Sequence, residues 1–215
     1  MHTKSEIDEI IRLLRDNYPE AYCALDYNKD YELLFSARLS AQCTDARVNT
    51  ITPLLFSRYP TLESFANADV SEVEKIIYPC GFFRSKARDI IAAAGMLLLE
   101  YRGRVPETMD ELLRLPGVGR KTANLMLGDI HNKPAVVVDT HCIRLSNRIG
   151  LVGTKDPAKI ETALREILPP EESSAFCHRL VLHGREVCKA KNPSCMMCCI
   201  SALCDFGTRV NGHTQ

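Results

Sequence analysis

Residues 115–127 read "LPGVGRKTANLML" and place two glycines and a proline inside otherwise helix-forming sequence. Apolar residues flank the turn on both sides, so we expect a helix, a tight turn and a second helix over 106–130. Gly117 and Gly119 would permit a left-handed backbone and keep Cβ atoms off the outer face. The turn amides would then coincide with the N-terminus of the second helix, which favours a phosphate oxygen. A tight turn without any ligand is the alternative.

Outside this turn the sequence is typical of a helical protein of ordinary composition. Its 215 residues are 46% hydrophobic and 25% charged, enough for a buried core. Helical periodicity recurs between breaks such as "PCG", "RGRVP" and "LPP", and only "AVVV" at 135–138 reads as a strand. One such run cannot build a sheet, so we expect an all-α fold. Ser5 with Asp8 is expected to cap the first helix, and Thr44 and Ser71 to cap later ones.

The charge balance limits how the chain could bind nucleic acid. Its 27 basic and 27 acidic residues give a formal net charge of zero, so such binding would need a local basic patch. The N-terminus lacks the apolar core of a signal peptide, and no run approaches about 18 apolar residues. We therefore expect a cytoplasmic protein, associated with the nucleoid if bacterial, with no membrane partner.

Two side chains have the chemistry of a catalytic pair. Lys121 lies in the first turn of the second helix, where the helix dipole disfavours a cation and so favours the neutral amine. Such an amine can attack an electrophilic carbon and hold it as a Schiff base. Asp139, in "AVVVDTH", would open the next helix and could accept a proton from the lysine or stabilise a cationic sugar. The alternatives are an ordinary solvated lysine and an N-cap without chemistry.

Five of the ten cysteines crowd into 17 positions near the C-terminus. Four of them follow the spacing C-x6-C-x2-C-x5-C, which suits the corners of a [4Fe-4S] cluster. Structural zinc more often uses two separated cysteine or histidine pairs, although it stays an alternative. Cys199 could replace Cys198 as a ligand, and we favour Cys198 on pattern. The expected ligands are Cys188, Cys195, Cys198 and Cys204.

Together, the hairpin with Lys121, the "VDTH" containing Asp139 and the cysteine loop resemble the endonuclease III family of DNA glycosylases in the helix–hairpin–helix superfamily. The similarity runs over about residues 5–207 and includes "LSAQCTDARVN" and "GFFRSKARDI". It implies two helical lobes with DNA in the cleft between them. A six-helix lobe over 22–133 would contain the hairpin. An iron–sulfur lobe would comprise 1–21 plus 134–215.

The resemblance also implies a function. The expected substrate is double-stranded DNA containing damaged pyrimidines or abasic sites, and the expected state is a monomer. Such an enzyme flips the damaged nucleotide into a pocket. Lys121 would attack C1′ and displace the oxidised base, Asp139 would assist, and β-elimination would cut the strand. The cluster would have a structural and DNA-docking role.

Further DNA contacts follow from matching positions in the family. Gln42 looks like the residue that fills the vacated stack, and Phe82 like the apolar wedge, where many relatives have an aliphatic residue. Core packing of Phe82 is the alternative. Ser40 and Asp45 match pocket positions, although Asp45 would also suit a helix cap. The remaining expected contacts are Gly117, Val118, Gly119, Arg120, Lys189 and Lys191.

Rival interpretations differ in what they require of the sequence. The adenine glycosylases of oxidised-guanine mismatches lack a lysine matching Lys121 and carry an additional C-terminal domain, for which this chain has no room. A uracil- or thymine-mismatch relative stays an alternative, because one sequence does not reveal the specificity of the base pocket. A non-catalytic DNA-binding module would not need both Lys121 and Asp139. A structural zinc protein would need neither.

Overall fold

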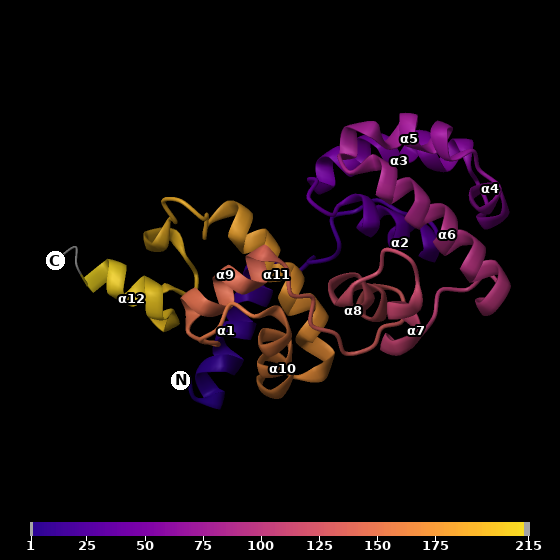
Figure 1. Ribbon diagram of the computed structural model, residues 1–215. Coiled ribbons are helices and arrows are strands. Elements are labelled where there is room, and N and C mark those ends of the chain that lie inside the picture. Colours follow the sequence, from indigo (N-terminus) through magenta and orange to yellow (C-terminus); the bar gives the residue numbers. More distant parts are fainter. Residues whose placement is uncertain (1, 213–215) are drawn as a thin grey trace. The chain divides into compact units, whose positions relative to one another are not determined.

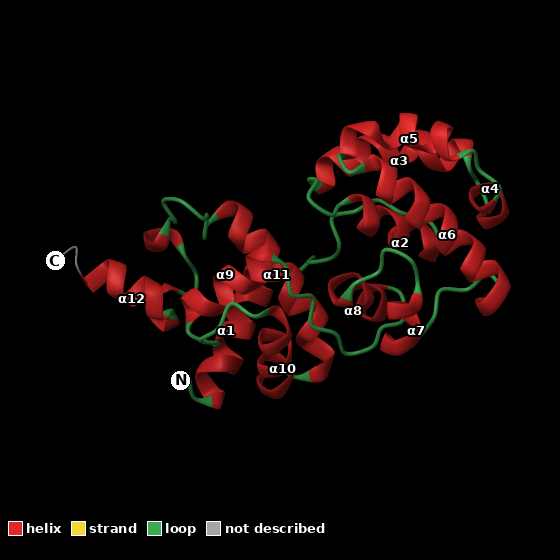
Figure 2. Ribbon diagram, viewed as in Figure 1, coloured by secondary structure: helices red, strands yellow, loops and turns green. Residues whose placement is uncertain are grey.

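The computed structural model describes residues 2–212, with side chains as far as 210, and all regular secondary structure within this range is helical (Figure 2). This confirms the predicted all-α fold. The "AVVV" run at 135–138 is buried but forms no strand. The Ala135 amide donates to Ser173 Oγ at 3.1 Å. A side chain therefore takes the place of a neighbouring strand as the partner of this buried amide.

The chain divides into two compact units, Cys23–His131 and Met1–Tyr22 with Asn132–Gln215. Seven α-helices form the first unit, one more than the six expected from the sequence. The extra helix has only five residues and is capped by the Thr61 side chain, so it is too short to show a helical period. These elements are α2 (Asp30–Leu39), α3 (Asp45–Arg58), α4 (Leu62–Ala66), α5 (Val70–Ile77), the 3-10 turn η1 (Tyr78–Cys80), α6 (Phe83–Tyr101), α7 (Met109–Arg114) and α8 (Arg120–Asp129).

The long helix α6 organises the core of this unit by packing against α2, α4 and α5 (Figure 1). An aromatic cluster fills the space beside it. Phe35 and Phe65 are fully buried and meet edge to face, with ring centroids 5.0 Å apart. This contact joins α2 to α4. The last residues of α2 and the first residues of α6 adjoin loops that matter below.

The second unit contains the remaining helices. These elements are α1 (Lys4–Asn17), α9 (Thr140–Ile149), α10 (Pro157–Ile167), η2 (Pro170–Glu172), α11 (Ser173–Glu186), η3 (Cys195–Met197), η4 (Ser201–Leu203) and α12 (Asp205–Gly212). Helix α11 packs against α1 and α9 in its core. Helix α12, which the sequence analysis did not anticipate, follows directly after the last cysteine. Within the described range, no helix is both long and apolar enough to span a membrane.

The helix starts correct two of the expected caps. Helix α1 begins two residues earlier than predicted, because Thr3 and Glu6 form the capping box in place of Ser5 and Asp8. Glu6 Oε2 accepts from the Thr3 amide at 2.7 Å. Helix α5 is capped by Asp69, whose Oδ1 accepts from the Ser71 amide at 2.8 Å. In both cases an earlier side chain reaches the exposed amides of the first turn. The predicted caps at Thr44 and Asp139 are confirmed.

Candidate functional site

The hairpin forms as predicted, with α7 and α8 packed together around residues 115–119 (Figure 1). The Val118 amide donates to the Leu115 carbonyl at 3.1 Å and closes the turn. Gly117 has a φ of 73°, whereas Gly119 has φ −106° and ψ 176°. The expectation of a left-handed backbone at both glycines was therefore wrong for Gly119, which is extended because it is the N-cap of α8.

The two glycines are needed for different reasons. A Cβ on Gly117 would lie 2.6 Å from Arg38 Nε and 2.9 Å from Asp89 Cβ. Arg38 and Asp89 form an ion pair of 2.7 Å beneath the turn. Gly117 is thus required by packing inside the protein. A Cβ on Gly119 would meet nothing within 4 Å, so this side of the turn has open space next to the backbone.

The N-terminus of α8 has the features of an anion site. Gly119 offers no side chain to cap the amides of the first turn, and the first intrahelical bond runs from the Ala123 amide to the Gly119 carbonyl at 2.9 Å. Arg120 and Lys121 occupy the first two helical positions, and both are exposed. Exposed amides, the positive end of the helix dipole and adjacent cations all favour a phosphate here.

Lys121 and Asp45 act electrostatically on the same buried thiol. Burial raises the pKa of Cys23 to about 12, and the charges of Asp129, Asp45 and Lys121 also act on it. Asp45 and Lys121 therefore lie in one neighbourhood of the unit. Asp45 sits in the first turn of α3, and the capping oxygen of that helix is Thr44 Oγ1, so Asp45 is not the cap.

The other expected pocket residue, Ser40, ends α2. Its hydroxyl donates to the Ala37 carbonyl at 3.0 Å, and the side chain is half-buried. The loop that follows carries Gln42. Because Ser40 is the C-cap of α2, its position is determined by the helix and not by the loop.

Gln42 and Phe82 share an unusual backbone. Their φ values are 55° and 48°, in the left-handed region that side chains other than glycine rarely adopt. Both are exposed, and 65% of the Phe82 surface is accessible. The alternative that Phe82 packs in the core is therefore wrong. A strained backbone that holds a large apolar ring in solvent is typical of a functional position.

Asp139 is the N-cap of α9 and also lies close to a histidine. Its Oδ1 accepts from the Cys142 amide at 2.8 Å, and its Oδ2 lies 3.3 Å from His141 Nδ1. The side chain is 17% exposed. Asp139 belongs to the second unit and Lys121 to the first, so their joint action is treated below as a proposal.

Four cysteines line one cavity in the second unit. Its walls include Cys188, Cys195, Cys198 and Cys204 but not Cys199. This is the ligand set favoured by the spacing, and the all-thiolate donor set fits an iron–sulfur cluster. Among residues 2–210, no three His, Cys, Asp or Glu side chains form a group for a single metal ion.

Buried polar side chains orient the cysteine loop. His183 lies between Cys198 Sγ, 3.3 Å from its Nε2, and the Tyr18 hydroxyl, 3.1 Å from its Nδ1. Burial lowers the pKa of His183, which keeps the ring neutral. Arg148 donates to the Lys189 carbonyl at 2.8 Å and the Ala190 carbonyl at 2.9 Å. The backbone of the basic loop is thereby held while the side chain of Lys189 stays exposed.

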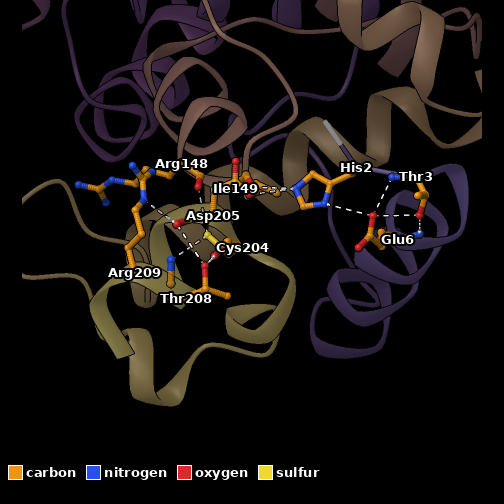
Figure 3. A network of polar contacts seen from close by, with 10 residues as sticks. His2, Thr3, Glu6, Arg148, Ile149, Cys204, Asp205, Thr208 and Arg209 are labelled. Atoms are coloured by element: carbon orange, nitrogen blue, oxygen red, sulfur yellow. Dashed lines mark hydrogen bonds and ion pairs between the residues drawn. The ribbon is translucent and has the colours of Figure 1, made fainter. Parts of the chain in front are cut away.

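The last cysteine is tied to α9 and α12 (Figure 3). The Cys204 thiol donates to the Arg148 carbonyl at 3.2 Å, and the Thr208 hydroxyl donates to the Cys204 carbonyl at 3.1 Å. His2 reaches the same end of α9 through the Ile149 carbonyl, at 2.9 Å from its Nε2. Helix α12 therefore closes the cysteine loop against the N-terminal segment.

The sequence-family model of the HhH-GPD superfamily of base excision DNA repair proteins matches residues 35–170 of this chain, which are more than half of it. Endonuclease III of Synechocystis sp. is 45% identical over 202 residues, which cover 94% of this chain and 92% of the relative. The chain belongs to the endonuclease III family. Endonuclease III of Escherichia coli K12 is 37% identical over 203 residues, covering 94% of this chain and 96% of the relative.

Solved structures of endonuclease III agree with this membership. A non-covalent endonuclease III–DNA complex has a TM-score of 0.92 and 40% identity, and the match covers 99% of this chain and all of that one. A trapped covalent endonuclease III–DNA intermediate has the same score and identity, with coverage of 98% and 100%. A thermostable thymine-DNA glycosylase at 23% identity, with a TM-score of 0.84, shares the fold. The chain is therefore a base excision DNA repair enzyme.

Sequence reasoning about this chain missed three buried or half-buried cations. Arg38 supports Gly117, Arg148 holds the basic loop, and Lys86 is completely buried. The only available signal for Lys86 was its place in "GFFRSKARDI", a stretch already singled out for Phe82. A lysine in an exposed helical turn and a lysine in the core look the same in sequence.

Proposed function

We propose that this chain removes oxidised pyrimidines from double-stranded DNA through Lys121 and then cleaves the abasic strand. It is a DNA glycosylase with abasic-site lyase activity. The residue assignment rests on one observation. Lys121 is exposed in the first turn of α8, whose N-terminus has no side-chain cap and therefore favours a phosphate. A strand bound there would bring its sugar near the amine.

In the proposed reaction, Lys121 Nζ attacks C1′ while the base leaves with the electron pair of the glycosidic bond. Loss of a proton from nitrogen and opening of the sugar ring give the Schiff base. Removal of a 2′ proton then expels the 3′ phosphate and breaks the strand. Asp139 would take up the lysine proton and stabilise the cationic sugar, as a partly exposed carboxylate can.

The proposed DNA contacts fall into two groups. The hairpin residues Gly117 to Arg120, together with Lys189 and Lys191, would bind phosphates and position the strand. Gln42 and Phe82 would enter the duplex, Gln42 in the space of the extruded nucleotide and Phe82 as a wedge, and both are supported by their exposure and strained backbone. Ser40 and Asp45 would line the pocket for the extruded base, which the shared neighbourhood of Asp45 and Lys121 supports.

We further propose that the four cavity cysteines hold a [4Fe-4S] cluster. When bound, the cluster would supply four fixed metal–thiolate bonds that hold the loop in one conformation. The chain's own contribution is to present Lys189 and Lys191 from that loop, where Arg148 holds the carbonyls of Lys189 and Ala190. This would provide the local basic patch that a net charge of zero requires. A cytoplasmic location and a monomeric state stay predictions.

A matched pair of variants tests the ligand set. Cys198→Ser is expected to lose the broad visible absorbance and most of the iron, because Cys198 lines the cavity. Cys199→Ser is expected to keep both, because the neighbouring Cys199 does not line it. Iron analysis and absorbance of the two purified proteins provide the measurement. The reverse result would assign Cys199 as the ligand, and colourless wild-type protein containing zinc would rule out the cluster.

The function itself is tested by trapping. Wild-type protein, incubated with a duplex oligonucleotide containing thymine glycol and with borohydride, is expected to form a stable covalent protein–DNA adduct, since borohydride reduces a Schiff base. A duplex with unmodified thymine at the same position is the control. Base release without any adduct would contradict a lysine Schiff base and favour direct attack by water.

A further inference from the structure

We propose that Lys86 is a positioning residue that holds the loops of Gln42 and Phe82 together, so that both side chains enter the duplex in register. The proposal rests on the DNA-contact roles proposed above for those two residues. Lys86 lies in the second turn of α6 and has no exposed surface. Its ammonium donates to carbonyls that belong neither to the hairpin nor to the cysteine loop.

The ammonium of Lys86 is fully used by backbone carbonyls. It donates to the Leu39 carbonyl at 2.8 Å, to the Ala41 carbonyl at 2.8 Å and to the Cys80 carbonyl at 2.9 Å. Three donors therefore meet three acceptors. No carboxylate lies within ion-pair distance of it in the part of the chain that the structure describes. The charge is balanced by main-chain dipoles alone.

Two of those carbonyls lie at helix ends, and that of Ala41 lies in the turn after α2. Leu39 is the last residue of α2, and Cys80 is the last residue of η1. Carbonyls at a C-terminus have no partner within their own helix and carry partial negative charge, so a cation is favoured there. One buried ammonium thus caps two chain segments that are far apart in sequence.

Each capped segment leads directly into a strained, exposed residue. Ala41 precedes Gln42, with φ 55°, and Cys80 is followed by Gly81 and then Phe82, with φ 48°. The backbone of Lys86 adds a further bond, because its amide donates to the Phe82 carbonyl at 3.1 Å. Lys86 is therefore bonded to Phe82 itself and to the residue before Gln42.

The cysteines of the same two loops also influence each other. Burial raises the pKa of the Cys80 thiol to about 11, and the nearby Cys43 adds to the shift. Cys43 follows Gln42 directly, so the loop of Gln42 lies near the residue that precedes Gly81 and Phe82. Burial also lowers the pKa of Lys86. A cation retained at such a site despite burial indicates that its three bonds matter for where the loops lie.

The test is a double-mutant cycle on single-turnover excision from duplex DNA containing thymine glycol. Lys86→Met keeps the length of the side chain and removes its three donors, and it is expected to slow excision by about a hundred-fold, the effect of a small misplacement. In a protein that already carries Gln42→Ala and Phe82→Ala, adding Lys86→Met should slow excision by no more than about two-fold. A change of that size is within the usual deviation from additivity of substitutions. The full loss in that background would overturn the proposal.

Two controls separate positioning from general loosening. Leu97→Ala removes a fully buried side chain from the other end of α6, so it destabilises the protein without touching the two loops. At a temperature well below its melting temperature, this variant is expected to excise the base at the wild-type rate. Cleavage of a single-stranded oligonucleotide with an abasic site needs no duplex entry, so Lys86→Met should leave it unchanged within about two-fold. Equal losses on both substrates would count against positioning.

The cycle also distinguishes this inference from the function beneath it. If Gln42→Ala with Phe82→Ala leaves duplex excision unchanged, their proposed DNA contacts fail and the role of Lys86 fails with them. If the double variant excises more slowly than wild type, but Lys86→Met slows it further by as much as it slows the wild type, only the role of Lys86 fails. Should Lys86→Met not fold, Lys86→Gln enters the same cycle, because its amide retains two donors.

Discussion

Lys121→Ala is expected to cleave the strand at least about a thousand-fold more slowly than wild type. It should also form no covalent adduct with DNA in the presence of borohydride, because no other amine would replace the nucleophile. Binding to a duplex with thymine glycol should weaken only modestly. One cation of a wider phosphate site is lost, while the hairpin amides and Arg120 stay in place. Cleavage is measured under single-turnover conditions and binding by fluorescence anisotropy at fixed salt.

The neighbouring residue supplies the matched control. Arg120→Ala removes an equal charge from the preceding helix position, so it should weaken binding and reduce its salt dependence. At saturating protein it should still form the adduct. If Lys121→Ala cleaves DNA at the wild-type rate, the nucleophile lies elsewhere. If Arg120→Ala also loses the adduct at saturation, the hairpin and not the amine determines the result.

Asp139→Asn is expected to slow base excision by about a hundred- to a thousand-fold with no change in melting temperature. The substitution separates the two roles of this side chain. An asparagine oxygen can still accept from the Cys142 amide, and Asn caps helices as well as Asp does. Only the negative charge and the proton-accepting capacity are lost. Single-turnover kinetics and thermal unfolding of the same preparation measure the two roles.

Asp139→Ala completes this comparison. It removes both the charge and the cap, so it should lose activity as Asp139→Asn does and also cost about 1 kcal/mol of stability. Wild-type activity in Asp139→Asn would reduce the residue to an N-cap. Equal destabilisation in both variants would show that the asparagine does not cap α9, and the kinetic loss would then have a structural explanation.

Much of this protein could be predicted from local sequence alone. Helical periodicity, a proline–glycine turn and the spacing of four cysteines each act over a few residues, so they indicate the all-α fold, the hairpin and the four cysteines that line one cavity. The cap at Asp139 is equally local. The five-residue helix α4 was not predicted, because it spans little more than one turn. The predicted cap of α1 was wrong, because Thr3 also satisfies the capping rule.

Only the tertiary structure decided the roles of residues that act through distant partners. Gly117 is required because Arg38 and Asp89, from α2 and α6, lie beneath it. Lys86 finds two of its three acceptors 45 and 47 residues away. A sequence records which groups can donate and accept, but burial and packing decide which of them meet. The exposure of Phe82 follows from the same cause, because the fold and not its hydrophobicity determines where the ring lies.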